Sequence, residues 1–518
     1  MRRKKFLCIL LSLYIVVVMI YTFRYELMSL VSQFINTDYV LENLTEKQKV
    51  EDFEVFYSNM LQSIPYLKNV KEIYGIDFEG RKDYYLSEIK ATKDNVEYYG
   101  VMEAISRDLA SFHTDICFPL YSSLRTIKCY GSEDVVQQFG MEAKMQAWSE
   151  EIEQKAKDYE NIDLFCVKYV DGKYILKEGW LSEEYKGMAN YELVSIDGIE
   201  TDLYVVENLS IYKLGYDSLF DKPYRENYLL NGGVGREVKV VWRNLEGEEI
   251  EQDLFIDKGV EAVASYGHLF LDRYEYYGEV GSQDFFAERD DANQVEYIAI
   301  NNFDNKKGNE LKEYLANMVY DKVVIDLRNN YGGYIEYAQK YLYPELHGDS
   351  VTFHMGWKVP DTRQNEKMTT NFILRLSSYE GEDERYKYYD QNLEFTGKAD
   401  ANKTVYYLVG PETGSAAATY AAMIKETGLG IVVGSNMGGE GLGASYICDS
   451  LQHSSLVYVY YPSVSTKEGS DSLTVPDVYI NQSIEDYGIQ EKSKIEGTEL
   501  LYKQRLSYDT VLKWVIEQ

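Results

Sequence analysis

A chain of 518 residues is long enough to form two or three domains, each burying its own core. Its hydrophobic content of 45% and aromatic content of 14% exclude a disordered or fibrous protein. The net charge is −32 and no basic stripe interrupts it, so nucleic acid is not expected as a partner because phosphate backbones would be repelled.

The N-terminus combines four cations with a long apolar run, and residues 6–23 read FLCILLSLYIVVVMIYTF without a charge. At about 1.5 Å per residue this helix would be roughly 27 Å long, close to the hydrocarbon thickness of a bilayer. The preceding cations predict a cytoplasmic tip. A cleaved signal peptide is the alternative, but no small-residue cleavage site follows. We therefore expect residues 1–23 to be a cytoplasmic tip and an uncleaved single-pass anchor in the cell membrane. A linker, residues 24–43, would join it to an extracytoplasmic part.

The five cysteines do not match the spacing of a zinc site. Cys117 and Cys129 could form a disulfide in an oxidising compartment. Since no other cluster of ligand residues appears, the sequence implies no metal and no cofactor.

The first region after the linker, residues 44–150, has a helical pattern. The stretches EKQKVEDFEVFYSNMLQSI and NVEYYGVMEAISRDLASF place apolar residues at spacings of three and four. The second stretch runs directly into His113 and Thr114. We expect this region to be a helical cap domain.

The second region, residues 160–260, has the pattern of short strands. YELVSIDGIE alternates and then turns at Asp197-Gly198, which predicts a hairpin. GREVKVVWRNLEGEEIEQDLFI predicts two strands around a turn at Glu246-Gly247. The order of these pieces resembles a PDZ domain, including the Asp-Gly turn before the helix that flanks the peptide. A glycine-rich loop for a peptide carboxylate is not evident, so a small β-domain of another kind is the alternative.

Strand and helix patterns alternate from about residue 294 onward. The strands are EYIAINNF, DKVVIDLR, TVYYLVG and GIVVG, and the helices are NELKEYLANMV, YIEYAQKYLYPEL and SAAATYAAMIKETG. This alternation predicts an α/β fold with a parallel sheet and right-handed crossovers. We expect residues 261–518 to form this core, with a site where the carboxyl ends of the strands meet helix N-termini.

Two of these strand ends carry residues suited to acyl transfer. Gly332 and Gly333 follow DKVVIDLR, and their backbone can approach a ligand closely with amides free to donate. Taken alone, this motif favours the alternative of a simple β–α turn. Ser415 follows TVYYLVG and begins a helix, where unpaired N–H groups would stabilise an oxyanion. The donors would be the amide of Ala416 and an amide at Gly332 or Gly333. The alternative for Ser415 is a simple helix N-cap.

A third strand end leads into the loop GSNMGGEGLG, residues 434–443. This loop does not have the pattern of a phosphate cradle, because no lysine–serine pair follows it and Glu440 would repel an anion. A loop that flanks an extended substrate fits the composition better.

The helical cap, the β-domain and the motifs VIDLRNNYGG, TGSAAATYAAMIK and VVGSNMGG occur in one order. Together they resemble the C-terminal processing peptidases (tail-specific proteases) and the tricorn-core serine peptidases. The resemblance covers most of the chain beyond the anchor. It implies a core with the crotonase-like or Clp-protease-like fold, a serine nucleophile at Ser415 and a polypeptide substrate.

Within the resembled family, the processing peptidases pair the serine with a lysine that lies 25 residues later. That position is Glu440 here, and no other lysine stands in the loop, so a Ser–Lys dyad is rejected. The branch that uses histidine instead has an Asp-Gly-His-Thr motif after a helix of the cap. His113 occupies the corresponding place, although Ser111 and Phe112 differ from the motif. The resemblance therefore implies His113 as the general base.

A histidine base also needs a carboxylate that orients it. In the histidine branch this is a glutamate shortly before a Pro-Asp pair, which here is residues 476–477. Ser470 stands at the usual offset, with two acidic residues beside it. Our assignment is Glu468 first, Asp471 second and Glu440 third.

These features predict a membrane-anchored, extracytoplasmic serine endopeptidase that forms an acyl-enzyme. The alternative from another class is a catalytically inactive peptide- or ligand-binding protein on the same scaffold, since a fold does not determine an activity. An enzyme of the crotonase type acting on acyl thioesters is a third interpretation. An external compartment and a PDZ-like domain favour peptides over thioesters.

Overall fold

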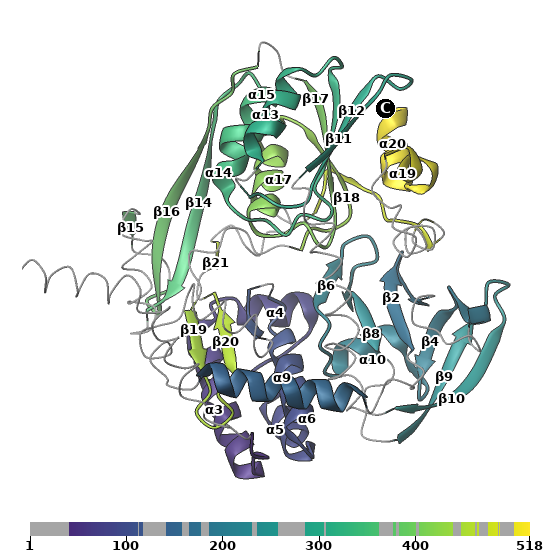
Figure 1. Cartoon of the computed structure of the whole chain (residues 1–518), viewed down its shortest axis with the longest axis vertical. Coiled ribbons are helices and arrows are strands. Elements are labelled where there is room, and N and C mark those ends of the chain that lie inside the picture. The colour runs from purple at the N-terminus through teal and green to yellow at the C-terminus, as the bar shows by residue number, and fades with distance from the viewer. Residues whose placement is uncertain are drawn as a thin grey trace, which may run out of the picture.

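The structure is a computed structural model of the whole chain (Figure 1). The described residues are 41–111, 113–117, 141–157, 165–177, 186–229, 236–256, 285–304, 307–361, 377–379, 383–399, 403–438, 447–461, 464–465, 475–484, 486 and 502–518.

Six strands form the central sheet of the core, in the order β11-β12-β13-β17-β18-β22. The five strands from β12 to β22 are parallel, which confirms the predicted parallel α/β sheet. The edge strand β11 is antiparallel to β12, and the strand–helix alternation did not predict it. The bounds are β11 Phe285–Asp290, β12 Val295–Ile300, β13 Lys322–Asp326, β17 Thr404–Val409, β18 Ile431–Gly434 and β22 Val478–Tyr479.

Helices cover both faces of this sheet (Figure 1). Successive residues of a strand point to opposite faces, so Val323 and Ile325 pack with α17, whereas Val324 packs with α20. The burial of both faces explains why the strand sequences are almost continuously apolar. One face carries α13 Gly308–Ala316, α14 Ile335–Tyr337, the π-helical turn Ala338–Leu342, α15 Tyr343–Leu346 and α17 Ser415–Thr427, and the other carries α19 Tyr502–Tyr508 and α20 Thr510–Glu517.

A long antiparallel hairpin beside the central sheet was not predicted. It consists of β14, Val351–Pro360, and β16, Tyr386–Phe395, with short edge strands β15, Ser377–Tyr379, and β21, Val464–Ser465. Alternate residues of β14 are buried, in the period of two that a strand with one covered face requires. This period was the sequence signal for the hairpin.

The predicted cap is helical but also contains a small sheet. Its helices are α3 Glu46–Ser63, α4 Leu67–Tyr74, α5 Lys82–Ala91, α6 Asn95–Arg107 and α9 Met141–Lys157.

The sheet of the cap joins distant parts of the chain, in the order β1-β20-β19. Its strands are β1, Asp115–Ile116, β20, Val457–Tyr460, and β19, Ile447–Ser450. The carboxylate of Asp52 in α3 accepts the N–H groups of His453 and Ser454 at 2.9 and 2.7 Å. Residues 447–460 therefore pack with the cap, although they lie within the sequence range predicted for the core.

The β-domain contains both predicted hairpins. β4, Glu192–Ile196, turns into β5, Ile199–Glu200, and α10, Thr201–Glu207, follows at once. β9, Arg236–Arg243, pairs along its length with β10, Glu249–Ile256. The remaining elements are β2 Cys166–Val170, β3 Lys173–Leu176, the 3-10 turn Lys186–Met188, β6 Leu214–Asp217, β7 Lys222–Arg225 and β8 Asn227–Leu229.

Two predictions concern parts of the chain that the structure describes incompletely. No helix within the described ranges has the length and apolarity needed to cross a bilayer, and the apolar run of residues 6–23 lies outside those ranges. Cys117 is buried, and Cys129 lies outside the described residues, so the disulfide considered between them stays a prediction.

His347, which follows α15, provides a test of the packing of the core. Its side chain is fully buried, and Nε2 lies 2.9 Å from the hydroxyl of Tyr407. Burial lowers the pKa of this imidazole from 6.5 to about 4. Below pH 6.5 the unfolded chain therefore binds a proton that the folded chain does not bind until about pH 4, and stability falls as the pH falls through this window.

We expect His347 to lower the free energy of unfolding by about 3 kcal/mol between pH 6.5 and pH 4. Urea titrations of wild type and His347→Gln across this window would measure it, because carboxylate titrations cancel in the difference between the two proteins. The control is Tyr407→Phe, which loses the same hydrogen bond but keeps the buried imidazole. Its free energy of unfolding should therefore still fall between pH 6.5 and pH 4. If the free energies of unfolding of wild type and His347→Gln changed in parallel with pH, the proposed contribution of the buried His347 imidazole would be contradicted.

Candidate active site

The turn between β17 and α17 holds Ser415 in an unusual backbone conformation. Ser415 has φ 48°, in the left-handed region that non-glycine residues seldom adopt. The preceding residue, Gly414, donates its N–H to the carbonyl of Asn330 at 3.0 Å. Thr413 accepts the N–H of Gly410 at 3.0 Å and donates to the carbonyl of Leu327 at 2.8 Å. These bonds tie the turn to the loop that follows β13 and maintain the strained serine.

The loop after β13 lies directly against this serine. Gly332 and Gly333 have φ values of 106° and 125°, which side chains rarely allow. A Cβ atom added to Gly332 would lie 2.6 Å from Cβ of Ser415 and 3.0 Å from the amide nitrogen of Ala416. A Cβ on Gly333 would lie 2.5 Å from the carbonyl oxygen of Phe303. Both positions therefore need glycine, and the close approach puts two predicted strand ends in one place.

The three predicted oxyanion donors are not equivalent in this geometry. The amide of Gly332 donates to Oδ1 of Asn330 at 2.8 Å, so it is already engaged within the loop. The amides of Gly333 and Ala416 donate to no other residue in the described part of the chain. Ala416 lies in the first turn of α17, where amides have no partner within the helix. The two amides that remain as candidate oxyanion donors are thus those of Gly333 and Ala416. The role of Gly332 is that its missing side chain lets the loop approach Ser415.

His113 lies in the segment that connects α6 to β1. Beyond the end of α6, Ala110 adopts a left-handed conformation with φ 50° and redirects the chain. The amide of His113 donates to Oγ of Ser111 at 3.1 Å, and the side chain is mostly buried. Its imidazole stacks on the ring of Tyr461, with 4.1 Å between centroids and 15° between planes. Because β1 pairs with β20, the chain brings Tyr461 to this histidine immediately after β20 ends.

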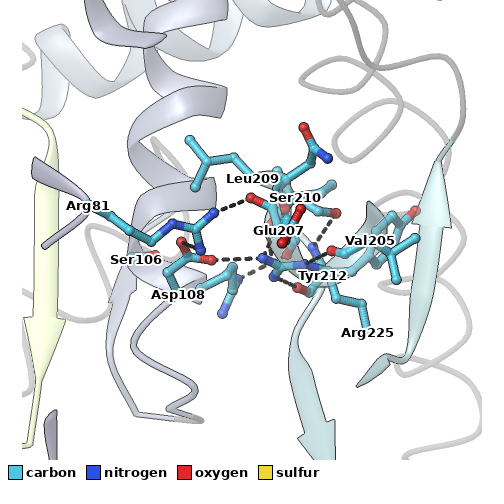
Figure 2. Close-up of polar contacts among 12 residues, drawn as sticks. Arg81, Ser106, Asp108, Val205, Glu207, Leu209, Ser210, Tyr212 and Arg225 are labelled. Atoms are coloured by element: carbon cyan, nitrogen blue, oxygen red, sulfur yellow. Dashed lines mark hydrogen bonds and ion pairs between the residues drawn. The ribbon is translucent and has the colours of Figure 1, made fainter. Parts of the chain in front are cut away.

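A buried ion pair fixes the end of α6 to the β-domain (Figure 2). The guanidinium of Arg225 donates to Oδ1 of Asp108 at 2.7 Å, and neither side chain is exposed to solvent. Arg225 also donates to the carbonyls of Val205 and Tyr212, both at 2.8 Å. Arg81 of the cap donates to the other oxygen of Asp108 at 3.0 Å. The segment that leads to His113 is thereby held from both sides.

A cavity of about 160 Å³ lies beside the turn that leads to Ser415, between the core and the β-domain. Gly410 and Gly434, at the carboxyl ends of β17 and β18, line it on the core side. Asp217 lines it on the side of the β-domain, where the adjacent Ser218 donates its N–H to Asn436 at 3.0 Å. This space thus lies at the carboxyl-end edge of the sheet, where α/β sheets bind ligands, and polar contacts between the two domains border it.

The structure brings some predicted site residues together and leaves others undescribed. Ser415, Ala416 and the two glycines meet at one point, and His113 is placed in the cap with Tyr461. Glu468, Asp471 and Glu440 lie outside the described residues.

Two residues of the arrangement were missed in the sequence. Asn330 precedes the glycine pair, and its position in the run Asn-Asn-Tyr-Gly-Gly is typical of a turn whose side chain caps its own backbone. Tyr461 had no local signal, because only strand pairing brings it to the histidine.

A strained serine at a helix start, packed against a glycine loop with two available amides, has the layout of a serine hydrolase. Residues 294–479 match the family model described as Peptidase family S41. The chain is a serine peptidase, and this matched core belongs to the S41 or C-terminal processing peptidase group. No curated protein matches the chain.

Three solved structures illustrate what the chain is similar to. Mature CPAF in complex with lactacystin aligns at 10% identity and TM-score 0.48, covering 91% of this chain and 99% of that one. The photosystem II D1 C-terminal processing protease aligns at 12% identity and TM-score 0.33, with coverages of 84% and 94%. The tricorn protease aligns at 12% identity and TM-score 0.28, with coverages of 91% and 36%. None of these TM-scores reaches 0.5.

Proposed function

We propose that the chain is a membrane-anchored, extracytoplasmic serine endopeptidase that cleaves polypeptides through an acyl-enzyme. The observation that carries this proposal is the close approach of Gly332 to Ser415 and to the amide nitrogen of Ala416. Residues 6–23 are the proposed anchor. The core is proposed to have the crotonase/Clp-protease-like fold. The β-domain is proposed to be PDZ-like, since α10 follows an Asp-Gly hairpin as the peptide-flanking helix of such a domain does.

In the acylation step, Oγ of Ser415 attacks the scissile carbonyl carbon while His113 takes the hydroxyl proton. The carbonyl oxygen becomes an oxyanion that accepts from the amides of Gly333 and Ala416. The C–N bond then breaks, and the imidazolium returns its proton to the leaving amine. In the second step, water loses a proton to His113 and attacks the ester carbonyl carbon. The bond between that carbon and Oγ of Ser415 then breaks, Oγ takes the proton back from His113, and the carboxylic acid is released. Glu468 or Asp471 would orient the imidazole.

Labelling of the full-length chain in mild detergent with a fluorophosphonate probe tests this function. We expect one adduct, located by tandem mass spectrometry on the peptide that contains Ser415. Because the histidine activates the hydroxyl, His113→Ala should slow labelling at least 100-fold, whereas His354→Ala, at an exposed histidine of β14, should not.

Folded wild type that takes up no probe would favour the inactive binding protein instead. Rapid labelling that persists in His113→Ala would keep the hydrolase but remove the histidine from its mechanism.

A further inference from the structure

A cluster of buried charges lies at the carboxyl end of β13, directly before the glycine loop. Asp326, the last residue of β13, accepts from Nε of Arg328 at 2.9 Å and from the hydroxyl of Tyr297 at 2.8 Å. Burial alone would raise the pKa of Asp326, but Arg328 and Arg505 hold this pKa well below its ordinary value. The carboxylate is therefore charged throughout the physiological range, and it needs its cations.

The C-terminal helices supply the other members of this cluster. Asp509, between α19 and α20, places Oδ2 2.6 Å from the guanidinium of Arg328. Its Oδ1 accepts the N–H of Leu512 at 3.0 Å and so caps α20. From α19, the guanidinium of Arg505 reaches Asp326 at 3.3 Å. Two arginines and two carboxylates thus join the C-terminal helices to the end of β13, and all four side chains are largely buried.

The cluster of Asp326, Arg328, Arg505 and Asp509 is connected by hydrogen bonds to the loop that faces Ser415. Leu327, between the two charged residues, accepts the N–H of Asn330 at 3.0 Å and the hydroxyl of Thr413 at 2.8 Å. Asn330 in turn accepts the N–H groups of Gly332 and Gly414. A shift of Arg328 therefore displaces the loop that carries Gly332 and the turn before Ser415. Oxyanion donors tolerate little displacement, because an error of about 1 Å can lower a rate by about 100-fold.

We propose that Asp509 is a positioning residue for the peptidase reaction: through Arg328 it holds the glycine loop in register with Ser415. The C-terminal helices, α19 and α20, are then part of the catalytic apparatus and not only a cover on one face of the sheet. This inference rests on the proposed function. Asp509 also lines the cavity between the core and the β-domain, but the positioning role assigns it no contact with the reacting atoms and acts through Arg328 and the backbone of Leu327.

Asp509→Asn separates the charge from the helix cap. Asparagine caps helices as well as aspartate does, so the bond to Leu512 is kept while the anion beside Arg328 is lost. The control is Asp94→Asn at the N-cap of α6. Asp94 accepts the N–H of Glu97 at 2.9 Å and pairs with Lys155 at 2.6 Å, so Asp94→Asn likewise keeps a helix cap and removes an ion pair, but away from the loop that carries Gly332.

The experiment measures the rate and the final extent of fluorophosphonate labelling in the full-length chain. For Asp509→Asn we expect a maximal labelling rate about 10- to 100-fold below wild type, with full final extent and little change in the probe concentration at half-maximal rate. Asp94→Asn should label at the wild-type rate. Asp509→Glu, which restores the charge, should recover part of the lost rate.

Two outcomes would overturn the positioning role. In one, Asp509→Asn labels as fast as wild type. In the other, its final extent falls while the rate is unchanged, which indicates only a larger unfolded fraction. Failure of the proposed function has a different signature, since wild type itself would then take up no probe.

Discussion

Replacing Ser415 with glycine or alanine is expected to abolish fluorophosphonate labelling and to lower peptide hydrolysis roughly a million-fold, as loss of the nucleophile does in other serine peptidases. The two variants should differ in stability. Ser415 has φ 48°, a conformation that costs a non-glycine residue about 1 kcal/mol, so Ser415→Gly relieves this strain and Ser415→Ala does not. Urea unfolding should show a gain of about 1 kcal/mol for glycine only.

Ser455 is the matched control, because it also has a positive φ, 60°, but lies in the cap portion of the chain. Ser455→Gly should retain labelling at the wild-type rate. A Ser415→Gly variant that still labels would remove Ser415 as the nucleophile. A Ser415→Gly variant less stable than Ser415→Ala would show that the left-handed conformation of Ser415 does not lower the stability of the protein.

The second large effect is expected on stability, from Arg225→Met. Among the described residues, this substitution leaves the buried carboxylate of Asp108 with Arg81 and Tyr85 as partners, and it removes the donors to the carbonyls of Val205 and Tyr212. Breaking a buried pair by removing one partner typically costs about 3–5 kcal/mol. The midpoint of thermal unfolding, followed by tryptophan fluorescence, should fall accordingly. The end of α6 should loosen, so labelling at Ser415 should slow in the fraction that remains folded.

Arg243→Met provides the comparison for this stability effect. Arg243 also bonds to two carboxylates, Glu192 and Glu249, but its side chain is 35% exposed. Solvent screens such pairs, so the expected cost is below about 1 kcal/mol. The double variant Arg225→Met/Asp108→Leu should recover part of the loss, because it leaves no unpaired carboxylate. Equal losses of stability for Arg225→Met and Arg243→Met would contradict the structural role of the buried Arg225–Asp108 pair shown in Figure 2.

Much of the fold could be predicted because the signals are local. The strands DKVVIDLR and TVYYLVG are continuous apolar runs, which a parallel sheet buried on both faces requires. The turn at Asp197-Gly198 carries its own backbone preference, since both residues have positive φ. The hairpin of β14 and β16 was missed, although residues of β14 alternate between buried and less buried. It is inserted between α15 and β17, and the strands and helices on either side of it still alternate, so that pattern gives no sign of the insertion.

The candidate site divides in the same way. Ser415 and the glycine pair could be predicted because a helix start and a backbone that needs positive φ are properties of a few adjacent residues. The engagement of the Gly332 amide by Asn330 is local as well, but it depends on a side-chain rotamer that the sequence does not specify. For His113 the residues alone indicated only a helix end, and its proposed role came from a resemblance.

The sequence by itself determined the α/β core, the two hairpins of the β-domain and the position of Ser415 at a helix start, because periodicity and turn chemistry act over a few residues. Only the tertiary structure decided that β20 pairs with β1 and brings Tyr461 to His113, and that Arg225 holds Asp108. The same is true of Asp509, which reaches Arg328 from the far end of the chain. These contacts join residues distant in sequence, and their energy comes from burial and charge pairing that exist only after the chain has folded.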